Sequence, residues 1–116
     1  MSHYLEDELR GLIGSDPQIL RFIESASLDG LWYWDLEQPE HEWMSDAFWT
    51  TLGIDPASRP HRPEAWQELA HPEDLAQIMA DLQHHCDDAD HPFEQLVRFR
   101  HADGSTVWVR CRGMAV

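Results

Sequence analysis

The sequence predicts an α+β domain, in which helices pack on one face of an antiparallel sheet. Three observations predict it. Amphipathic helical segments open the chain and return in its middle, short aromatic or alternating segments form two strand pairs, and an Asp-Gly dipeptide separates the last pair. The chain has 116 residues, the size of one domain, and 42% are hydrophobic, enough for an ordinary core. Helices that alternate with hairpins are typical of this fold class.

The N-terminal region is predicted to form two helices. Over residues 4–13 apolar side chains recur at helical spacing beside acidic ones, and Gly14 is expected to end this segment. Ser15-Asp16-Pro17 places a capping side chain before a proline, which predicts a second helix over 17–25. The apolar stripe of the first helix is expected to pack on the sheet or on its copy in a homodimer. The candidate dimer-interface residues on this stripe are Leu5, Leu9, Leu12 and Ile13.

Two short strands are predicted next. Residues 31–36 are rich in aromatic side chains and too few for a helix, which favours a strand. A turn at 38–40 and a second, antiparallel strand over 41–44 follow. Alternation puts Trp32 and Trp34 on one face of the first strand and Tyr33 on the other.

Three helices are predicted in the middle of the chain. Ser45 is expected to cap a short helix that runs to Leu52, and another spans residues 64–70. The longest opens at 71–74, where a proline occupies the first turn and two acids lie near the positive end of the helix dipole. Its expected buried stripe is Leu75, Ile78, Met79 and Leu82.

The last two strands are predicted over 93–100 and 106–116, joined by a tight turn at Asp103-Gly104. Alternation gathers arginines on one face of this hairpin, where they would repel one another unless paired. Two interpretations stay open: salt bridges to acidic side chains, or bidentate binding of an anionic ligand such as a carboxylate. The arginines are Arg98, Arg100, Arg110 and Arg112, and the candidate acidic partners are Asp35, Glu73 and Asp74.

The charge balance narrows the partners. Acidic residues number 22 against 8 basic ones, a formal net charge of −14, and this excess of negative charge disfavours nucleic acids and anionic membrane surfaces as partners. The chain has no apolar run long enough to span a membrane and no signal peptide, which predicts a cytoplasmic protein. Its two cysteines are too few for a disulfide scaffold and are expected to be thiols.

Motifs for catalysis and metal binding are missing from the sequence. There is no nucleophile elbow, phosphate-binding glycine loop or His-Glu-x-x-His pair, which predicts a noncatalytic chain. Residues 84–91 contain histidine, cysteine and aspartate, the ligand types of zinc sites. Adjacent residues on a helix point apart, and no second half with metal-ligand spacing occurs, so a solvated helix end is the preferred interpretation.

Several segments, taken together and in order, resemble the PAS (Per-Arnt-Sim) sensor domains of bacterial signalling proteins. They are residues 30–36 in the first strand, 43–45 through 52–54 from strand into helix, His71-Pro72-Glu73-Asp74, and 98–100 through Asp103-Gly104 to Trp108 and Arg112-Gly113. The resemblance implies a sensor domain over 28–116 preceded by flanking helices over 1–27. It also implies a five-stranded sheet, so the last strand is expected to be missing here and the chain to be a fragment.

The resemblance further implies a sensory and dimerisation module that regulates an output domain in the same polypeptide, a diguanylate cyclase or a histidine kinase. A small ligand-processing enzyme and a pure interaction scaffold are the alternatives. No haem or flavin is expected, because the long helix lacks a central histidine and the photochemical cysteine motif is missing; an unidentified small ligand stays possible. The tryptophans either fill the core or line a ligand pocket. The candidate ligand-binding residues are Trp34, Trp43, Trp66, Met79, Arg98, Trp108 and Arg110.

Overall fold

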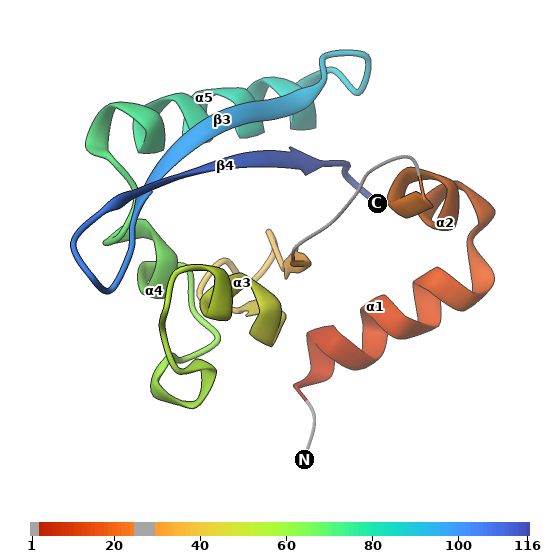
Figure 1. The fold of residues 1–116 in the computed structure, drawn as a ribbon. Helices are drawn as coiled ribbons and strands as arrows, with labels where there is room; N and C mark the ends of the chain where they lie inside the picture. Colours follow the sequence, from red (N-terminus) through yellow and green to blue (C-terminus); the bar gives the residue numbers. More distant parts are fainter. Residues whose placement is uncertain (1–2, 25–29) are drawn as a thin grey trace. The chain divides into compact units, whose positions relative to one another are not determined.

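A computed structural model describes residues 3–24 and 30–116 of the chain (Figure 1). The chain divides into two compact units, Met1–Ala65 and Trp66–Val116. The first unit holds two helices, a hairpin of two short strands and a further helix, and the second holds a long helix and a hairpin of two long strands. Both hairpins are antiparallel. The predicted α+β class is confirmed, and the helices and strands follow in the predicted order.

Helix α1 (Tyr4–Ser15) packs on the first hairpin of its own chain. Leu5 and Leu9 are buried in a cluster with Trp43, and the partly buried Ile13 packs against it, so the predicted apolar stripe covers the hairpin at these three positions. The helix continues past Gly14 to Ser15, whose hydroxyl donates to the Gly11 carbonyl. The prediction that Gly14 ends this helix is therefore wrong. Helix α2 (Pro17–Glu24) begins at the predicted proline.

Strands β1 (Trp32–Trp34) and β2 (Glu42–Met44) are shorter than the predicted segments. The reason is Asp35, whose Oδ1 accepts the backbone N–H groups of Glu37 and Gln38 and turns the chain out of the strand. In the register of the hairpin Tyr33 lies opposite Trp43, as the alternation of the first strand allows. The predicted boundary between residues 27 and 28 lies outside the described residues.

Gly30 precedes β1 at a point where the backbone comes close to the next helix. A Cβ atom at this position would lie 2.9 Å from the backbone nitrogen of Phe48, which is closer than real Cβ atoms come to another residue. Helix α3 (Asp46–Thr51) follows β2, and Gly53 after it has a positive φ of 72°. A short 3-10 helix, η1 (Pro56–Ser58), was not predicted.

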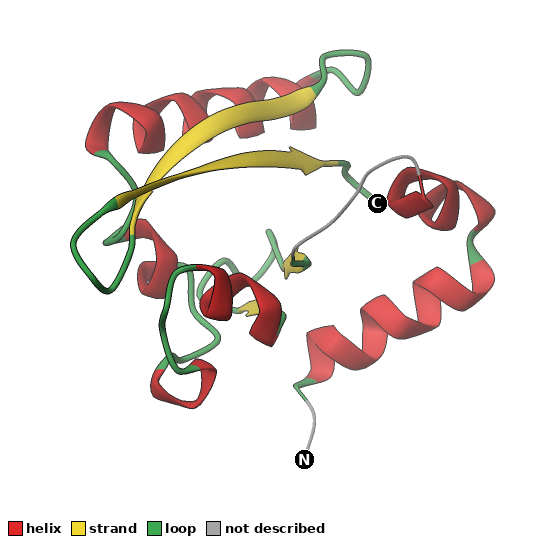
Figure 2. Ribbon diagram, viewed as in Figure 1, coloured by secondary structure: helices red, strands yellow, loops and turns green. Residues whose placement is uncertain are grey.

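Four further elements belong wholly or partly to the second unit. Helix α4 (Glu64–Gln67) spans the boundary between the units and is shorter than predicted. Helix α5 (Pro72–Asp87) runs along strand β3 (Phe93–Arg100), which pairs with β4 (Thr106–Gly113), as Figure 2 shows. Gly104, in the predicted turn, has a positive φ of 88°. Strand β4 ends at Gly113, three residues earlier than predicted.

The inward face of α5 differs from the prediction. Ile78 is buried as expected, but Met79 is 40% exposed, so its placement on the buried stripe is wrong. Polar side chains of α5 also contact the hairpin or the segments flanking it, and they recur at helical spacing. They are Asp74, which binds Arg98, Asp81, which accepts from Gln95, and His85, which binds the backbone of His91 and Ala115.

No helix within residues 3–24 and 30–116 combines the length and apolar character needed to cross a lipid bilayer.

Candidate functional site

The second hairpin carries one face that we call the outer face. Its side chains come from Glu94, Leu96, Arg98 and Arg100 of β3 and from Thr106, Trp108, Arg110 and Arg112 of β4, in direct cross-strand pairs. Two large apolar side chains lie here in solvent, Leu96 at 64% and Trp108 at 63% exposure. The other face of β3 is buried. The outer face thus combines arginines with exposed apolar side chains.

Arg98 on the outer face is fixed to the first turn of α5. Its Nε and Nη2 donate to the two carboxylate oxygens of Asp74 at 2.9 and 2.8 Å, and its backbone N–H donates to the same carboxylate at 2.8 Å. These hydrogen bonds from Arg98 hold the pKa of Asp74 well below its usual range. Glu73 lies 3.6 Å from the same guanidinium. Such a bidentate pair fixes the position of β3 relative to α5.

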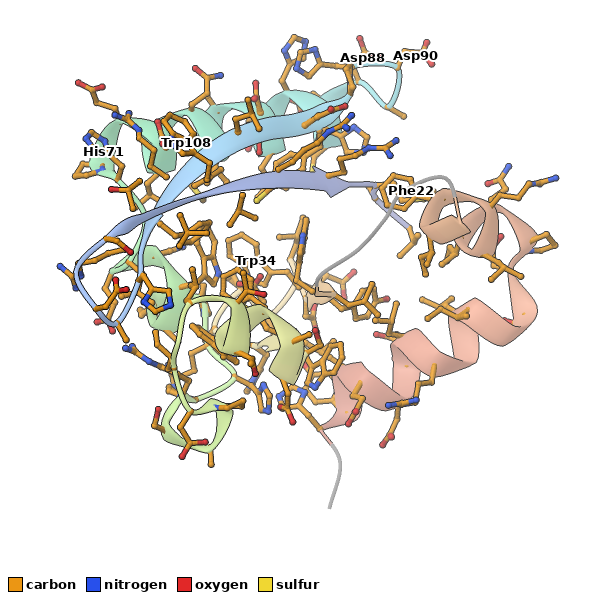
Figure 3. The ribbon with its side chains drawn as sticks, in the orientation of Figure 1. Phe22, Trp34, His71, Asp88, Asp90 and Trp108 are labelled. Carbon is orange, nitrogen blue, oxygen red and sulfur yellow. The ribbon has the colours of Figure 1, made fainter. Side chains whose placement is uncertain are left out.

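Trp108 is joined to this pair through Arg98. The guanidinium carbon lies 5.6 Å from the centre of the indole ring, within the range of a cation–π contact. The carbonyl of Arg98 accepts the backbone N–H of His71, the N-cap of α5. Figure 3 labels Trp108 and His71 at the end of the hairpin where α5 begins. A displacement at the start of α5 would therefore reach the exposed indole through two consecutive contacts.

Cross-strand ion pairs hold the other end of the outer face. Arg110 donates to Glu94 through Nε at 2.6 Å, and Arg112 Nε lies 3.9 Å from the same carboxylate. The structure thus supplies acidic partners for Arg98, Arg110 and Arg112 and supports the salt-bridge interpretation for them. Asp74 and Glu73 are among the predicted partners, whereas Glu94, which the register of the hairpin places opposite Arg112, was not predicted.

Gln95 places a buried acceptor on the opposite face of β3. The residue is 9% exposed, and its Nε2 donates to Asp81 of α5 at 3.0 Å. Within the described part of the chain its Oε1 has no hydrogen-bond partner. A buried carbonyl oxygen without a partner is costly, so this atom is suited to accept a hydrogen bond from a ligand or an ordered water.

The candidate ligand-binding residues do not gather in one place. In the first unit Trp43 is buried in the cluster under α1, and Trp34 lies on the other face of the hairpin, where its indole donates to the Pro39 carbonyl at 2.8 Å. In the second unit Trp66 packs against Phe99 on the buried side of β3.

The remaining candidates lie on exposed surfaces. Arg98, Trp108 and Arg110 share the outer face, and Met79 is on α5. The structure therefore brings together only these three residues of the outer face, and the buried Gln95 carbonyl was missed. The sequence does indicate Gln95, because it is a polar residue at an inward position of an otherwise apolar strand face.

The histidine-rich end of α5 is held by contacts within the protein. The rings of His84 and His91 stack at 3.6 Å, and His91 lies 3.6 Å from Asp81. The buried His85 ring contacts the His91 carbonyl through Nδ1 and accepts the Ala115 N–H at Nε2. Across the described residues, no group of three such side chains is arranged to hold a metal ion.

Comparison with known proteins places the chain in a sequence family. A family model described as the PAS fold matches residues 41–116. The chain is also similar to a solved structure, the sensory box histidine kinase/response regulator from Burkholderia thailandensis E264, with 28% identity and a TM-score of 0.63. That match covers 83% of this chain and 71% of the other. No curated protein matches the chain significantly.

Proposed function

Because the chain belongs to the PAS fold family of sensor domains, we propose that it senses a small ligand or partner and passes the signal to an output domain in the same polypeptide. The similar structure carries the name of a histidine kinase, so a histidine kinase is the output proposed first. A diguanylate cyclase is the alternative output domain, and the experiment below distinguishes it from a histidine kinase. The chain itself is proposed to be noncatalytic and cytoplasmic.

The observation that carries this proposal is the link from Asp74 through Arg98 to Trp108. It connects the first turn of α5 to an exposed indole on the outer face. Signal transmission requires two arrangements whose balance a ligand can shift, and a fixed ion pair between helix and strand couples the two elements. We propose that the outer face, with Leu96 and Trp108, contacts the segment that leads to the output domain.

The buried side of β3 is the proposed input. The free Oε1 of Gln95 lies next to Asp81 of α5, so a ligand that donates a hydrogen bond to this oxygen would also lie beside the helix. Such a ligand would affect the position of α5 relative to β3. The Asp74–Arg98 pair fixes the same relative position. A small molecule with an N–H or O–H group is the class that this site accepts.

Dimerisation is proposed to accompany signalling, through α1. Leu5 and Leu9 are buried against Trp43, whereas Leu12 and Ile13 are half-exposed. Ile13 also packs against the cluster of Leu5, Leu9 and Trp43. Of the four candidate interface residues, Leu12 is therefore proposed to supply the contact surface, and the other three hold the helix on its own hairpin. The acidic side chains of α1 would oppose association at low salt.

The experiment uses the full-length polypeptide. Autophosphorylation with labelled ATP and synthesis of cyclic di-GMP from GTP are measured for the wild type and for Trp108→Ala. We expect one of the two activities to be present and to change at least threefold in the variant. The matched control is Arg62→Gln, which removes an exposed Arg–Glu contact of 3.7 Å in the loop before α4 and should leave the output unchanged.

An unchanged output from a Trp108→Ala protein that melts like the wild type would refute the role of the outer face. Sedimentation of the chain at high salt tests the dimer separately. Leu12→Asp should give a monomer at concentrations where the wild type is dimeric, and a monomeric wild type at millimolar concentration would refute dimerisation through α1.

A further inference from the structure

Three histidines meet where helix α1 begins. His3 is the N-cap of α1, and its ring centre lies 5.0 Å from that of His61 and 6.2 Å from that of His41. His41 directly precedes β2, and His61 belongs to the loop between η1 and α4. The backbone carbonyl of His61 accepts the N–H of Glu42, which ties that loop to the hairpin. All three rings therefore belong to segments that hold the start of α1 in the first unit.

The capping role of His3 depends on an unprotonated nitrogen. Its Nδ1 accepts the backbone N–H of Leu5 at 3.1 Å. A proton on Nδ1 would remove this acceptor and place a positive charge at the positive end of the helix dipole. The neutral ring stabilises the first turn of α1, and the charged ring destabilises it.

We propose that His3, His41 and His61 form an acid-sensitive clasp, which holds the start of α1 at neutral pH and releases it when the imidazoles become protonated. Charging two or three rings at these separations introduces repulsion between α1 and the segments that it contacts. The clasp does not depend on the proposed signalling role, because its opening is measured directly on the amides of α1.

The charged groups around the clasp come from α1 and from the turn between β1 and β2, where Asp35 also interacts electrostatically with His41. Glu6 and Asp7 of α1 favour a proton on His3, and Glu40 lies 3.7 Å from His41. Other effects on the pKa of His3 outweigh the attraction to Glu6 and Asp7. Burial of the ring first, and then the positive charges of His61 and His41, lower the pKa of His3 below its usual value.

The direction of the pH effect follows. Because the pKa of His3 is lower in the folded state, the detached helix binds the proton more tightly. The attachment of α1 is complete above about pH 6.5, the ordinary pKa of histidine, and is lost as the pH falls through the lower pKa of the folded state.

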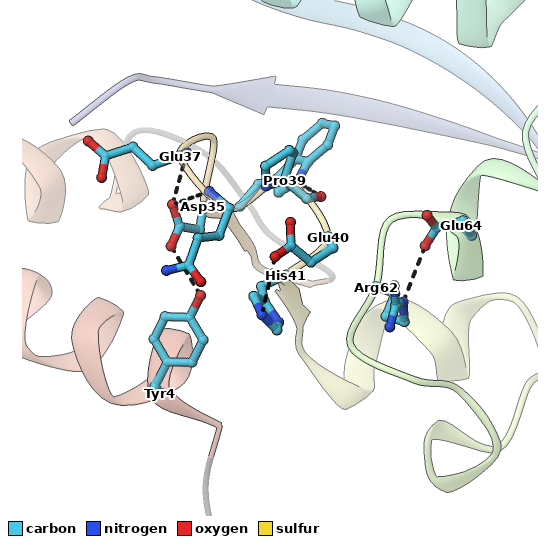
Figure 4. A network of polar contacts seen from close by, with 10 residues as sticks. Tyr4, Asp35, Glu37, Pro39, Glu40, His41, Arg62 and Glu64 are labelled. Atoms are coloured by element: carbon cyan, nitrogen blue, oxygen red, sulfur yellow. Dashed lines mark hydrogen bonds and ion pairs between the residues drawn. The ribbon is translucent and has the colours of Figure 1, made fainter.

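The neighbouring side chains of Tyr4 and Asp35 do not change their charge between pH 8 and 5. Tyr4 donates to Asp35 at 3.0 Å, as the dashed line in Figure 4 shows. The pKa of Tyr4 is raised, chiefly by burial and by this bond. Burial opposes ionisation of Asp35, but the amide N–H groups of Gln38 and Glu37 together with the Tyr4 hydroxyl lower its pKa. Neither Tyr4 nor Asp35 therefore changes its charge between pH 8 and 5.

Amide hydrogen exchange of the chain, read by NMR at pH 7.5 and 5.0 as protection factors, tests the clasp. We expect the protection of the α1 amides to fall at least tenfold more than that of the β3–β4 amides. His3→Asn keeps a capping acceptor without a titrating group, so its α1 protection should be nearly equal at the two pH values. The matched control is His101→Asn, because His101 Nδ1 accepts the Asp103 N–H at 3.0 Å in the β3–β4 turn. It should respond like the wild type.

Equal protection of α1 at both pH values in the wild type, or a His3→Asn protein that loses α1 protection as the wild type does, would overturn the proposal. A second measurement tests the clasp if the His3→Asn protein does not fold. In His61→Gln the NMR titration midpoint of the His3 ring should move to higher pH, because one neighbouring positive charge is gone. A midpoint that stays in place contradicts the clasp.

Discussion

At the scale of single residues, the Asp74 carboxylate joins the start of α5 to strand β3. Its carboxylate accepts three hydrogen bonds from Arg98, two from the guanidinium and one from the backbone. The sequence placed Asp74 correctly in the first turn of the long helix and named it as a candidate partner of an arginine. It could not select Asp74 over Asp35, because that choice depends on which strand the helix N-terminus meets.

The depressed pKa of Asp74 gives a prediction for acid stability. A carboxylate whose pKa is lower in the folded state stabilises that state above its unfolded pKa of about 3.9, and the contribution is lost as the pH falls further. Asp74→Asn should be less stable than the wild type at pH 7 and should lose less stability between about pH 4 and 2. Urea unfolding at several pH values measures both.

The control for this prediction is Asp90→Asn, in the acidic loop after α5. It should follow the wild-type pH profile. Parallel profiles for Asp74→Asn and the wild type would show that the ion pair with Arg98 contributes nothing to folding.

At the scale of the elements, local patterns located the helices and strands well, and tertiary contacts decided the rest. The proline at the start of α5 and the Asp-Gly turn both act within a few residues, so the sequence shows them directly. The polar inward positions of α5 have partners on β3 and near the chain end, far away in sequence. Apolar periodicity alone therefore predicts Met79 at a buried position and does not predict His85.

The candidate site was only partly predictable for the same reason. Alternation along each strand placed the arginines on one face. Their pairing with Glu94 required the register of the hairpin, and the unpartnered oxygen of Gln95 required knowledge of what packs against it. Both depend on contacts between elements.

The β3–β4 turn gives a prediction at this scale. Gly104 has a φ of 88°, and a Cβ atom there would meet no other atom within 4 Å, so backbone conformation alone decides which residues fit. Gly104→Val should destabilise the domain by about 1–3 kcal/mol, because β-branched residues tolerate positive φ poorly. Gly104→Asn is the matched control and should cost less, since asparagine enters this region more readily. Urea melts that give both variants the same midpoint would contradict the turn geometry.

At the scale of the whole molecule, the net charge of −14 governs the response to salt. Carboxylates outnumber basic groups by 22 to 8, so repulsion exceeds attraction when the chain is compact. Raising NaCl from 10 to 200 mM shortens the Debye length from about 30 Å to below about 10 Å, and the melting temperature should rise. Choline chloride at equal ionic strength should act in the same way. A melting temperature that falls with salt would show that the ion pairs of the outer face outweigh the repulsion.

The segment just before α5 has a consequence for the behaviour of the protein at high concentration. Leu69 and His71 bond to the backbone of Arg100 and Arg98 on the side of β3 away from β4, and Asp74 takes the remaining N–H of Arg98. Unpaired strand edges are templates on which other chains aggregate. At this end of β3 an incoming strand would first have to displace the protein's own backbone and an ion pair. The chain is thereby protected from amyloid-like growth at that edge, and the same contacts that connect α5 to Trp108 also contribute to its solubility.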